Sequence, residues 1–304
     1  MMRILFVGAV EFSRQCLEEL IGCGQDIAAV LTLEQAAAAG HADFADLGVV
    51  AAAHGIPCHR IRDINEPGTV ELIRSLRPDL ILVLGWSQLI GKAVLEIPPR
   101  GCIGSHPALL PQHRGRHPIV WALVEGLTES GLTLFSLNEE VDGGDILWQR
   151  SFPIRLEDDA ASIYARVCAE GRAAVRELLP QLEQGIAHRV PQDASQATHW
   201  RKRTDTDGEI AWETPTLRTY NLIRALTRPY VGAHTFYQGR KLRVWRSALP
   251  SRPTVAGGNK ARAGTVVGHG DSGLLVKTGD GYLRVLEYDA AETGSLPVGV
   301  RLGR

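Results

Sequence analysis

The stretch RILFVGAVEFSRQCLEELIG, residues Arg3–Gly22, opens as a strand and continues as a helix. Arg3–Gly8 is a short apolar run that ends at a glycine, which is typical of a strand buried on both faces of a parallel sheet. Phe12–Ile21 then repeats apolar residues at helical spacing. The stretch therefore predicts the first strand–helix unit of an α/β sheet.

Apolar runs continue to alternate with helix-spaced segments as far as Gly185. Further strands are expected at Ile27–Thr32, Asp79–Leu84, Gly101–Ser105, Gly131–Leu137 and Ile146–Ile154. Helices are expected at Phe44–His54, Thr69–Arg77, Ile119–Glu125 and Ala160–Gln184. This alternation is typical of an α/β protein with a doubly wound parallel sheet. We therefore predict a Rossmann-like domain over residues 1–187.

The composition changes after Gly185. Residues 188–206 are polar and irregular, which predicts a linker. Beyond them, short strands with glycine-containing turns surround one helix at Arg218–Leu226. These strands are expected at Glu209–Trp212, Ala233–Tyr237, Lys241–Trp245, Gly264–Gly268, Gly273–Thr278 and Leu283–Tyr288. The pattern predicts a small, OB-like β-barrel domain over residues 207–304.

Composition indicates a cytoplasmic enzyme. The chain has 304 residues and a formal net charge of −1, which gives no global reason to bind nucleic acid or anionic membranes. Its five cysteines are odd in number and contain no CxxC pair, which argues against a disulfide framework or a zinc site. No apolar run has the length of a signal sequence core or a membrane span. No cluster has metal-ligand spacing, so we expect no metal.

Three polar segments should meet at the carboxyl edge of the sheet, where ligands bind in such folds. They are the loop Val10–Phe12, the segment that starts at His106, and the run Glu139–Asp145. Asp142 could orient the His106 imidazole and raise its basicity. Each signal is weak alone: a histidine at a strand end is usually a polar cap, and VDGGD is usually a turn.

Three motifs in order carry a resemblance that changes these odds. GCIGSHPALLPQHRG, residues 101–115, closely resembles the signature Asn-x-His-x-x-Leu-Leu-Pro-x-x-Arg-Gly of the folate-dependent formyltransferases. VDGGDIL, residues 141–147, resembles the Asp-x-Gly-Asp loop of that family. The tail DGEIAWETPTLRTYNLIRALTRPYVGAHTFYQGRKLRVW, residues 207–245, is similar to its C-terminal domain. The family comprises methionyl-tRNA formyltransferases and sugar N-formyltransferases.

The resemblance implies N10-formyltetrahydrofolate as the formyl donor, His106 as the catalytic histidine and Asp142 as its partner. Gly104 stands where the family has a catalytic asparagine, so the usual oxyanion contact is missing. The implied folate pocket consists of Trp86, Ser87, Gln88, Leu89, Ile90, Glu139, Val141 and Asp142. The implied acceptor side consists of Val10, Glu11, Phe12, Pro111, Arg114, Gly115 and Arg116, with the two arginines suited to a phosphate or carboxylate.

The missing amide of Gly104 needs a replacement, because one oxyanion donor is worth about 10²–10³ in kcat. A water molecule in the vacated space, a protonated His106, or Asn138 could supply it. Ser105 is less suitable, because adjacent strand residues point to opposite faces.

The acceptor is expected to be a small amine on a nucleotide-linked amino sugar. The stretch Leu33–Gly48 contains no lysine or arginine, and the net charge is near zero, which argues against a tRNA. The basic run Trp200–Arg203 is usually a solvated segment. Methionyl-tRNA, an amino acid such as a hydroxylated ornithine, folate hydrolysis and mere folate binding remain as alternatives. The C-terminal domain would serve acceptor binding or a homodimer contact.

Overall fold

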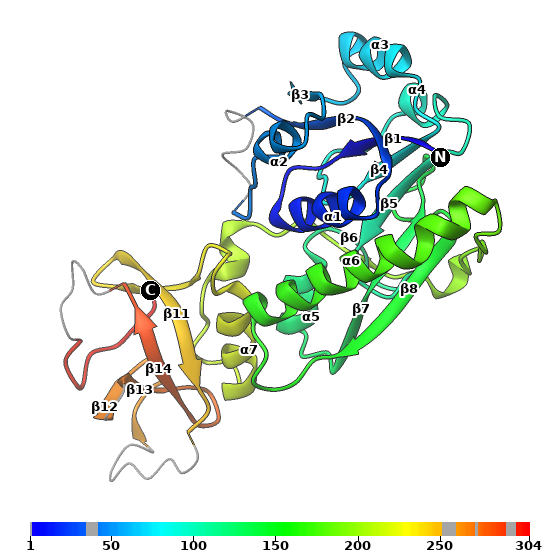
Figure 1. Ribbon diagram of the computed structural model, residues 1–304. Coiled ribbons are helices and arrows are strands. Elements are labelled where there is room, and N and C mark those ends of the chain that lie inside the picture. Colours follow the sequence, from blue (N-terminus) through cyan, green and yellow to red (C-terminus); the bar gives the residue numbers. More distant parts are fainter. Residues whose placement is uncertain (1, 35–41, 251–259, 271–272, 290–295) are drawn as a thin grey trace. The chain divides into compact units, whose positions relative to one another are not determined.

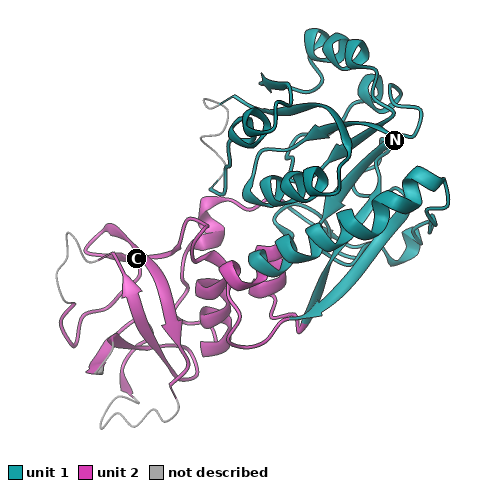
Figure 2. Ribbon diagram, viewed as in Figure 1, with its two compact units in different colours: residues 1–118, 129–153, 164–201 teal, residues 119–128, 154–163, 202–304 magenta. Residues whose placement is uncertain are grey.

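The structure, a computed structural model, describes residues 2–34, 42–250, 260–270, 273–289 and 296–304. The chain forms two compact units (Figure 2). Unit 1 comprises residues 1–118, 129–153 and 164–201, and unit 2 comprises residues 119–128, 154–163 and 202–304. Residues 188–201, which we expected as linker, thus belong to unit 1.

Unit 1 is built on a seven-stranded sheet (Figure 1). Its strands are β1 (Arg3–Val7), β2 (Asp26–Leu33), β3 (Cys58–Ile61), β4 (Leu80–Val83), β5 (Cys102–His106), β7 (Glu129–Ser136) and β8 (Ile146–Pro153). They lie in the order β3-β2-β1-β4-β5-β7-β8. The first five run parallel, and β7 and β8 add an antiparallel edge. The predicted α/β fold is confirmed.

Helices cover both faces of this sheet, as a doubly wound fold requires. In unit 1 they are α1 (Glu11–Gly22), α2 (Leu47–Ala53), α3 (Pro67–Leu76), α4 (Lys92–Leu95) and most of α6 (Ala160–Gln184). The helix α5 (Pro118–Val124) belongs mostly to unit 2. Leu5, Val7, Ile81 and Val83 form one core cluster with side chains of α3 and α4. The alternate strand residues Ile4, Phe6, Leu80 and Leu82 are also buried, as expected for strands covered on both faces. Figure 1 draws α1 and α6 along one face of the sheet.

Unit 2 contains the predicted small antiparallel β-domain. Its elements are α7 (Thr216–Leu226), β10 (Ala233–Tyr237), β11 (Arg240–Ala248), β12 (Val266–Gly270), β13 (Gly273–Lys277) and β14 (Tyr282–Tyr288). The strands pair in the order β10-β11-β14-β13-β12. Trp212 is buried, and its indole N–H donates to Thr235 Oγ1 over 2.9 Å. The strand expected at Glu209–Trp212 is reduced to a single bridge between Glu209 and His234.

Within the described ranges, no helix combines the length and apolar character needed to cross a membrane. Within the same ranges, no group of three or more His, Cys, Asp and Glu side chains could hold a metal ion.

Candidate active site

His106 is the last residue of β5, at the carboxyl edge of the sheet, and its side chain is 6% exposed. Its Nε2 lies 2.8 Å from the carbonyl oxygen of His113. A carbonyl oxygen only accepts, so Nε2 carries the hydrogen and a neutral ring keeps its lone pair on Nδ1. That Nδ1 lies 3.5 Å from Oδ2 of Asp142. The structure therefore brings together the histidine and the carboxylate that the sequence paired.

The loop after His106 is shaped by β7 and β8. Thr133 Oγ1 donates to the carbonyl of Ala108 over 2.7 Å. Gln149 Nε2 donates to the carbonyl of Leu110 over 2.9 Å. Because both donors sit on strands, the loop is anchored to the sheet by hydrogen bonds as well as stiffened by its prolines, of which Pro111 is half-buried.

Asp142 is fixed by its own loop. Its backbone is left-handed, with φ of 53°, a conformation that aspartate adopts more readily than most residues. Its Oδ2 accepts a hydrogen bond of 2.8 Å from the backbone N–H of Gly115. The same oxygen thus lies close to both Gly115 and His106, so the motifs at residues 101–115 and 141–147 meet at one carboxylate.

Arg114 is buried and committed to its own chain. Its side chain is 2% exposed, and Nη1 donates to Glu140 Oε1 over 2.6 Å. Its Nε and Nη2 donate to Gln192 Oε1 over 3.2 and 2.8 Å. The Arg114 guanidinium, which we expected on the acceptor side, is therefore hydrogen-bonded to Glu140 and Gln192 of its own chain. Arg116, by contrast, is exposed.

Residues 189–200 pack against this loop. The short strand β6 (Arg114–Gly115) pairs in parallel with β9 (His199–Trp200). The rings of His113 and Trp200 stack with centroids 4.1 Å apart. A Cβ on Gly115, whose φ is +106°, would lie 2.2 Å from the carbonyl oxygen of Trp200. Only glycine fits here, because a neighbouring backbone occupies the side-chain position.

The space beside Gly104 is filled. A Cβ placed on Gly104 would lie 2.5 Å from Cδ2 of Leu137. Leu137 thus occupies the position that a side chain on Gly104 would enter, and a water molecule as the replacement for the amide stays a prediction. Asn138 is exposed, and its Oδ1 accepts from the backbone N–H of Glu140 over 3.0 Å. Neither the signature nor the Asp142 motif marked Leu137, which lies far from Gly104 in sequence.

Residues 86–90 follow β4 and suit a planar heteroaromatic ligand with polar edges. Trp86 and Ile90 pack against the sheet core, and Trp86 Nε1 is buried without a hydrogen-bond partner among the described residues. Leu89 is 66% exposed and Val141 is 42% exposed. The side-chain amide of Gln88 is hydrogen-bonded within the chain: Oε1 accepts from the Ile64 N–H, and Nε2 donates to the Arg62 carbonyl. A buried indole N–H that no described residue accepts, and exposed apolar side chains in the segments expected at the folate, suit the polar edge and the apolar faces of a pterin. Ser87 follows Trp86 directly in the sequence.

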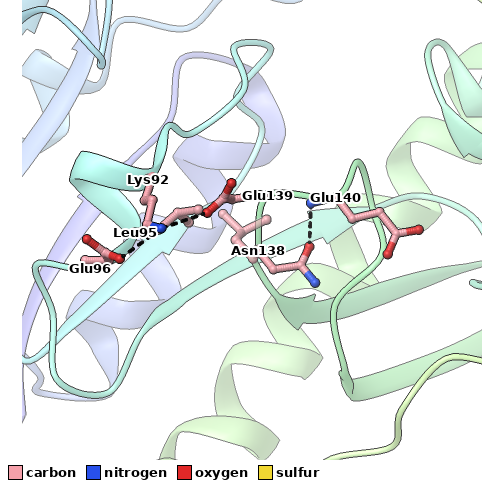
Figure 3. A pocket seen from close by; sticks show the side chains of 7 residues that line it. Lys92, Leu95, Glu96, Asn138, Glu139 and Glu140 are labelled. Atoms are coloured by element: carbon pink, nitrogen blue, oxygen red, sulfur yellow. Dashed lines mark hydrogen bonds and ion pairs between the residues drawn. The ribbon is translucent and has the colours of Figure 1, made fainter.

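A pocket of about 440 Å³ adjoins these segments (Figure 3). It is lined by Lys92, Leu95, Glu96, Leu137, Asn138, Glu139 and Glu140. Lys92 Nζ lies 3.8 Å from Glu96 and 3.6 Å from Glu139. Glu139, expected at the folate, thus lines a pocket whose floor includes the leucine that covers Gly104.

The loop Val10–Phe12 is tied to the sheet. Val10 and Phe12 are buried, and Glu11 forms an ion pair with Arg14, whose hydrogen bond lowers the pKa of the Glu11 carboxyl. Ser13 Oγ donates to the carbonyl of Leu84 over 2.6 Å. These side chains thus join the ends of β1 and β4, and an acceptor contact by them stays a prediction.

Comparison with known proteins agrees with this geometry. A family model described as formyl transferase matches residues 2–179, and the model of its C-terminal domain matches residues 202–297. The chain is 33% identical over 286 residues to a methionyl-tRNA formyltransferase of Geobacter metallireducens, covering 93% of this chain and 89% of that protein.

Two solved structures share the fold. One is an N-formyltransferase from Helicobacter canadensis with folinic acid and dTDP-3-aminofucose, with a TM-score of 0.70, 15% identity, and coverage of 94% of this chain and 99% of that one. The other is HypX from Aquifex aeolicus with tetrahydrofolic acid, with a TM-score of 0.66, 22% identity and 94% of this chain, which spans 44% of HypX. The chain belongs to the formyl transferase family and is an N10-formyltetrahydrofolate-dependent N-formyltransferase.

Proposed function

We propose that this enzyme transfers the formyl group to the amino group of methionyl-tRNA. The observation that carries the proposal is the relative from Geobacter metallireducens, which is named for that reaction and matches nearly the full chain. Other curated relatives at 32–33% identity carry the same name. Our preference for a nucleotide-linked amino sugar is therefore replaced by the tRNA alternative.

The distribution of charge supports a nucleic-acid acceptor. Residues 202–304 carry 16 Lys and Arg against 9 Asp and Glu, whereas residues 1–201 carry 17 against 25. The near-neutral total conceals a basic C-terminal part, and tRNA recognition needs such cations for its phosphates. Our expectation against a nucleic-acid partner conflicts with the names of these relatives, and it rested on a net charge that averages two parts of opposite charge.

The basic run Trp200–Arg203 contributes little to this argument. Trp200 stacks on His113, and the Arg203 guanidinium lies 4.8 Å from the ring centroid of Trp121. The Trp200 ring and the Arg203 guanidinium are therefore both engaged with aromatic rings of their own chain. The cations that favour an RNA acceptor are those spread over the rest of the C-terminal part.

The site suits removal of a proton from the attacking amine. Since Nε2–H of His106 donates to the His113 carbonyl, Nδ1 is the nitrogen that accepts this proton. Asp142, with Oδ2 3.5 Å away, then stabilises the imidazolium. The amine nitrogen would form its bond to the formyl carbon, and the proton held by His106 would pass to the folate nitrogen as the bond between that nitrogen and the formyl carbon breaks. A protonated His106 is the donor we propose for the oxyanion, since Gly104 has no side-chain amide and Leu137 Cδ2 lies 2.5 Å from where its Cβ would be.

A small amine remains the second candidate, for one reason. Leu33–Gly48 has no lysine or arginine, although residues 35–41 of it lie outside the described residues. An acceptor loop without cations would suit an amino sugar better than a tRNA stem.

One assay separates the candidates. Tetrahydrofolate release and formylated product are measured with charged initiator tRNA, with amino-sugar nucleotides, and without acceptor. We expect efficient formylation of the tRNA, with kcat/KM that falls steeply as salt increases. Formylation of a sugar nucleotide with higher kcat/KM would overturn the proposal. Amine-independent release would identify a hydrolase, and no release at all a folate binder.

Two charge variants sharpen the assay. Arg218 and Lys260 are exposed residues of the C-terminal part, and Arg62 is an exposed arginine of the acidic part. Changing Arg218 and Lys260 together to Gln should lower kcat/KM for tRNA and leave a small amine unaffected. Arg62→Gln is the matched control and should change neither.

A further inference from the structure

Gln192 lies in the segment that sequence patterning treats as a linker, and its side chain reaches the Asp142 loop. Its Nε2 donates to the carbonyl oxygens of Asp142 and Gly144 over 2.8 and 2.7 Å. Its Oε1 accepts from the buried guanidinium of Arg114 over 2.8 Å. Carbonyls only accept and a guanidinium only donates, so this orientation of the amide is the one that satisfies all partners.

The contacts close into one network around the carboxylate. Arg114 also donates to Glu140 Oε1 over 2.6 Å, and Glu140 lies two residues before Asp142 in the same loop. Gly115, the next residue, donates its N–H to Oδ2 of Asp142. Hydrogen bonds therefore join the loop after His106 to the loop that contains Asp142. Within this network, Gln192 is the side chain that binds backbone carbonyls of the Asp142 loop.

Asp142 needs this support because of its backbone. A left-handed conformation costs a non-glycine residue about 1–2 kcal/mol and persists only where surrounding contacts hold it. Of the two peptide carbonyls that Gln192 binds, one belongs to Asp142 and the other lies two residues further on. Without these bonds the loop can relax, and the carboxylate then turns away from His106.

We propose that Gln192 is a positioning residue for formyl transfer, which sets the distance between Asp142 and Nδ1 of His106. It contacts no reacting atom. The inference rests on the proposed roles of His106 and Asp142. The kcat of Asp142→Asn alone tests the role of Asp142, and the double-mutant cycle tests the role of Gln192.

Gln192→Glu is the informative variant. The carboxylate keeps the length of the side chain and an acceptor for Arg114, but it replaces the two N–H bonds with oxygens that face carbonyl oxygens. A displacement of about 1 Å at a catalytic group can cost on the order of 10²-fold in rate. We expect kcat to fall about 10- to 100-fold, with smaller changes in KM for folate and for the acceptor.

Gln196→Glu is the matched control. Gln196 is exposed on the same segment, and its side-chain nitrogen contacts Ser195 Oγ at 3.5 Å. It undergoes the same change of charge without touching the site, so kcat should stay at the wild-type value. Equal activities of the two variants would overturn the proposal.

A double-mutant cycle with Asp142→Asn tests the mechanism of the effect. If Gln192 acts through Asp142, then Gln192→Glu should cost less than about twofold once the carboxylate is gone. A purely structural role would cost the same factor in both backgrounds and would overturn the proposal. Wild-type kcat in Asp142→Asn alone would instead remove Asp142 from the mechanism.

Gln192→Met provides an uncharged second variant, so that the test still applies if Gln192→Glu misfolds. It has similar length, adds no charge and removes the same two donors. Its loss of kcat should show the same dependence on Asp142, and thermal melting of each variant identifies any loss of folded protein. A Met variant with wild-type kcat would also overturn the proposal.

Discussion

Gly104→Asn should restore the amide of the family signature without restoring its function. The new Cβ would lie 2.5 Å from Cδ2 and 3.1 Å from Cγ of Leu137, and real Cβ contacts are rarely so close. Leu137 would have to leave its place against the sheet core, where it packs with partial burial. Overpacking of this kind costs about 1–3 kcal/mol. We expect the free energy of unfolding to fall by that amount, and kcat not to rise.

The assay pairs urea unfolding with steady-state formylation. Gly268→Asn is the matched control, because a Cβ on that strand glycine meets nothing within 4 Å. Leu137→Ala should make room, so that adding Gly104→Asn to it costs no further stability and raises kcat relative to Leu137→Ala alone. A stable Gly104→Asn variant with kcat raised about tenfold or more would refute the reasoning, since Leu137 would then not block the amide.

Three further predictions follow from single groups. His106→Ala should lower kcat by about 10²–10⁴-fold with a smaller loss of folate affinity, as measured by single-turnover kinetics and folate titration. Arg114→Met should lower the free energy of unfolding by about 1–3 kcal/mol in urea melts, because it leaves Gln192 Oε1 without its partner in a buried site. Burial lowers the pKa of His234 below its usual 6.5, and Lys241 adds to this. The unfolded chain therefore binds a proton more readily, so the melting temperature should rise with pH below about 6.5, and His234→Gln should flatten that rise.

The fold was largely predictable because its strands are apolar on both faces. β1 and β4 are short runs bounded by glycine or proline, and each matches its expected range within two residues. The edge strand β3 was missed, because of its residues Cys58–Ile61 only the last is buried. Trp212 suggested a strand by its apolar neighbours, yet it fills the core of unit 2 from a turn.

The site was predictable where sequence motifs hold its parts, and not where tertiary packing does. His106 and Asp142 each lie in a recognisable motif. β7 runs antiparallel to β5, so it is the loop after β7, and not a parallel strand end, that places Asp142 Oδ2 3.5 Å from His106 Nδ1. Leu137 and Gln192 carry no such signal, because their roles depend on contacts with residues 33 and 50 positions away. Arg114 was expected on the acceptor side, and no motif in the sequence indicated that Glu140 and Gln192 would both pair with it in a buried position.

The pairing of β6 with β9 determines where the catalytic part of this enzyme can be separated from the rest. A fragment that ends at residue 187, where the helical pattern stops, would lack Gln192, the backbone that pairs with Gly115 and the ring that stacks on His113. A fragment that ends after Arg201 retains all three. Any chimaera that exchanges the C-terminal domain between members of the family should therefore be joined after Arg201, and a junction in the preceding polar segment would divide the active site itself.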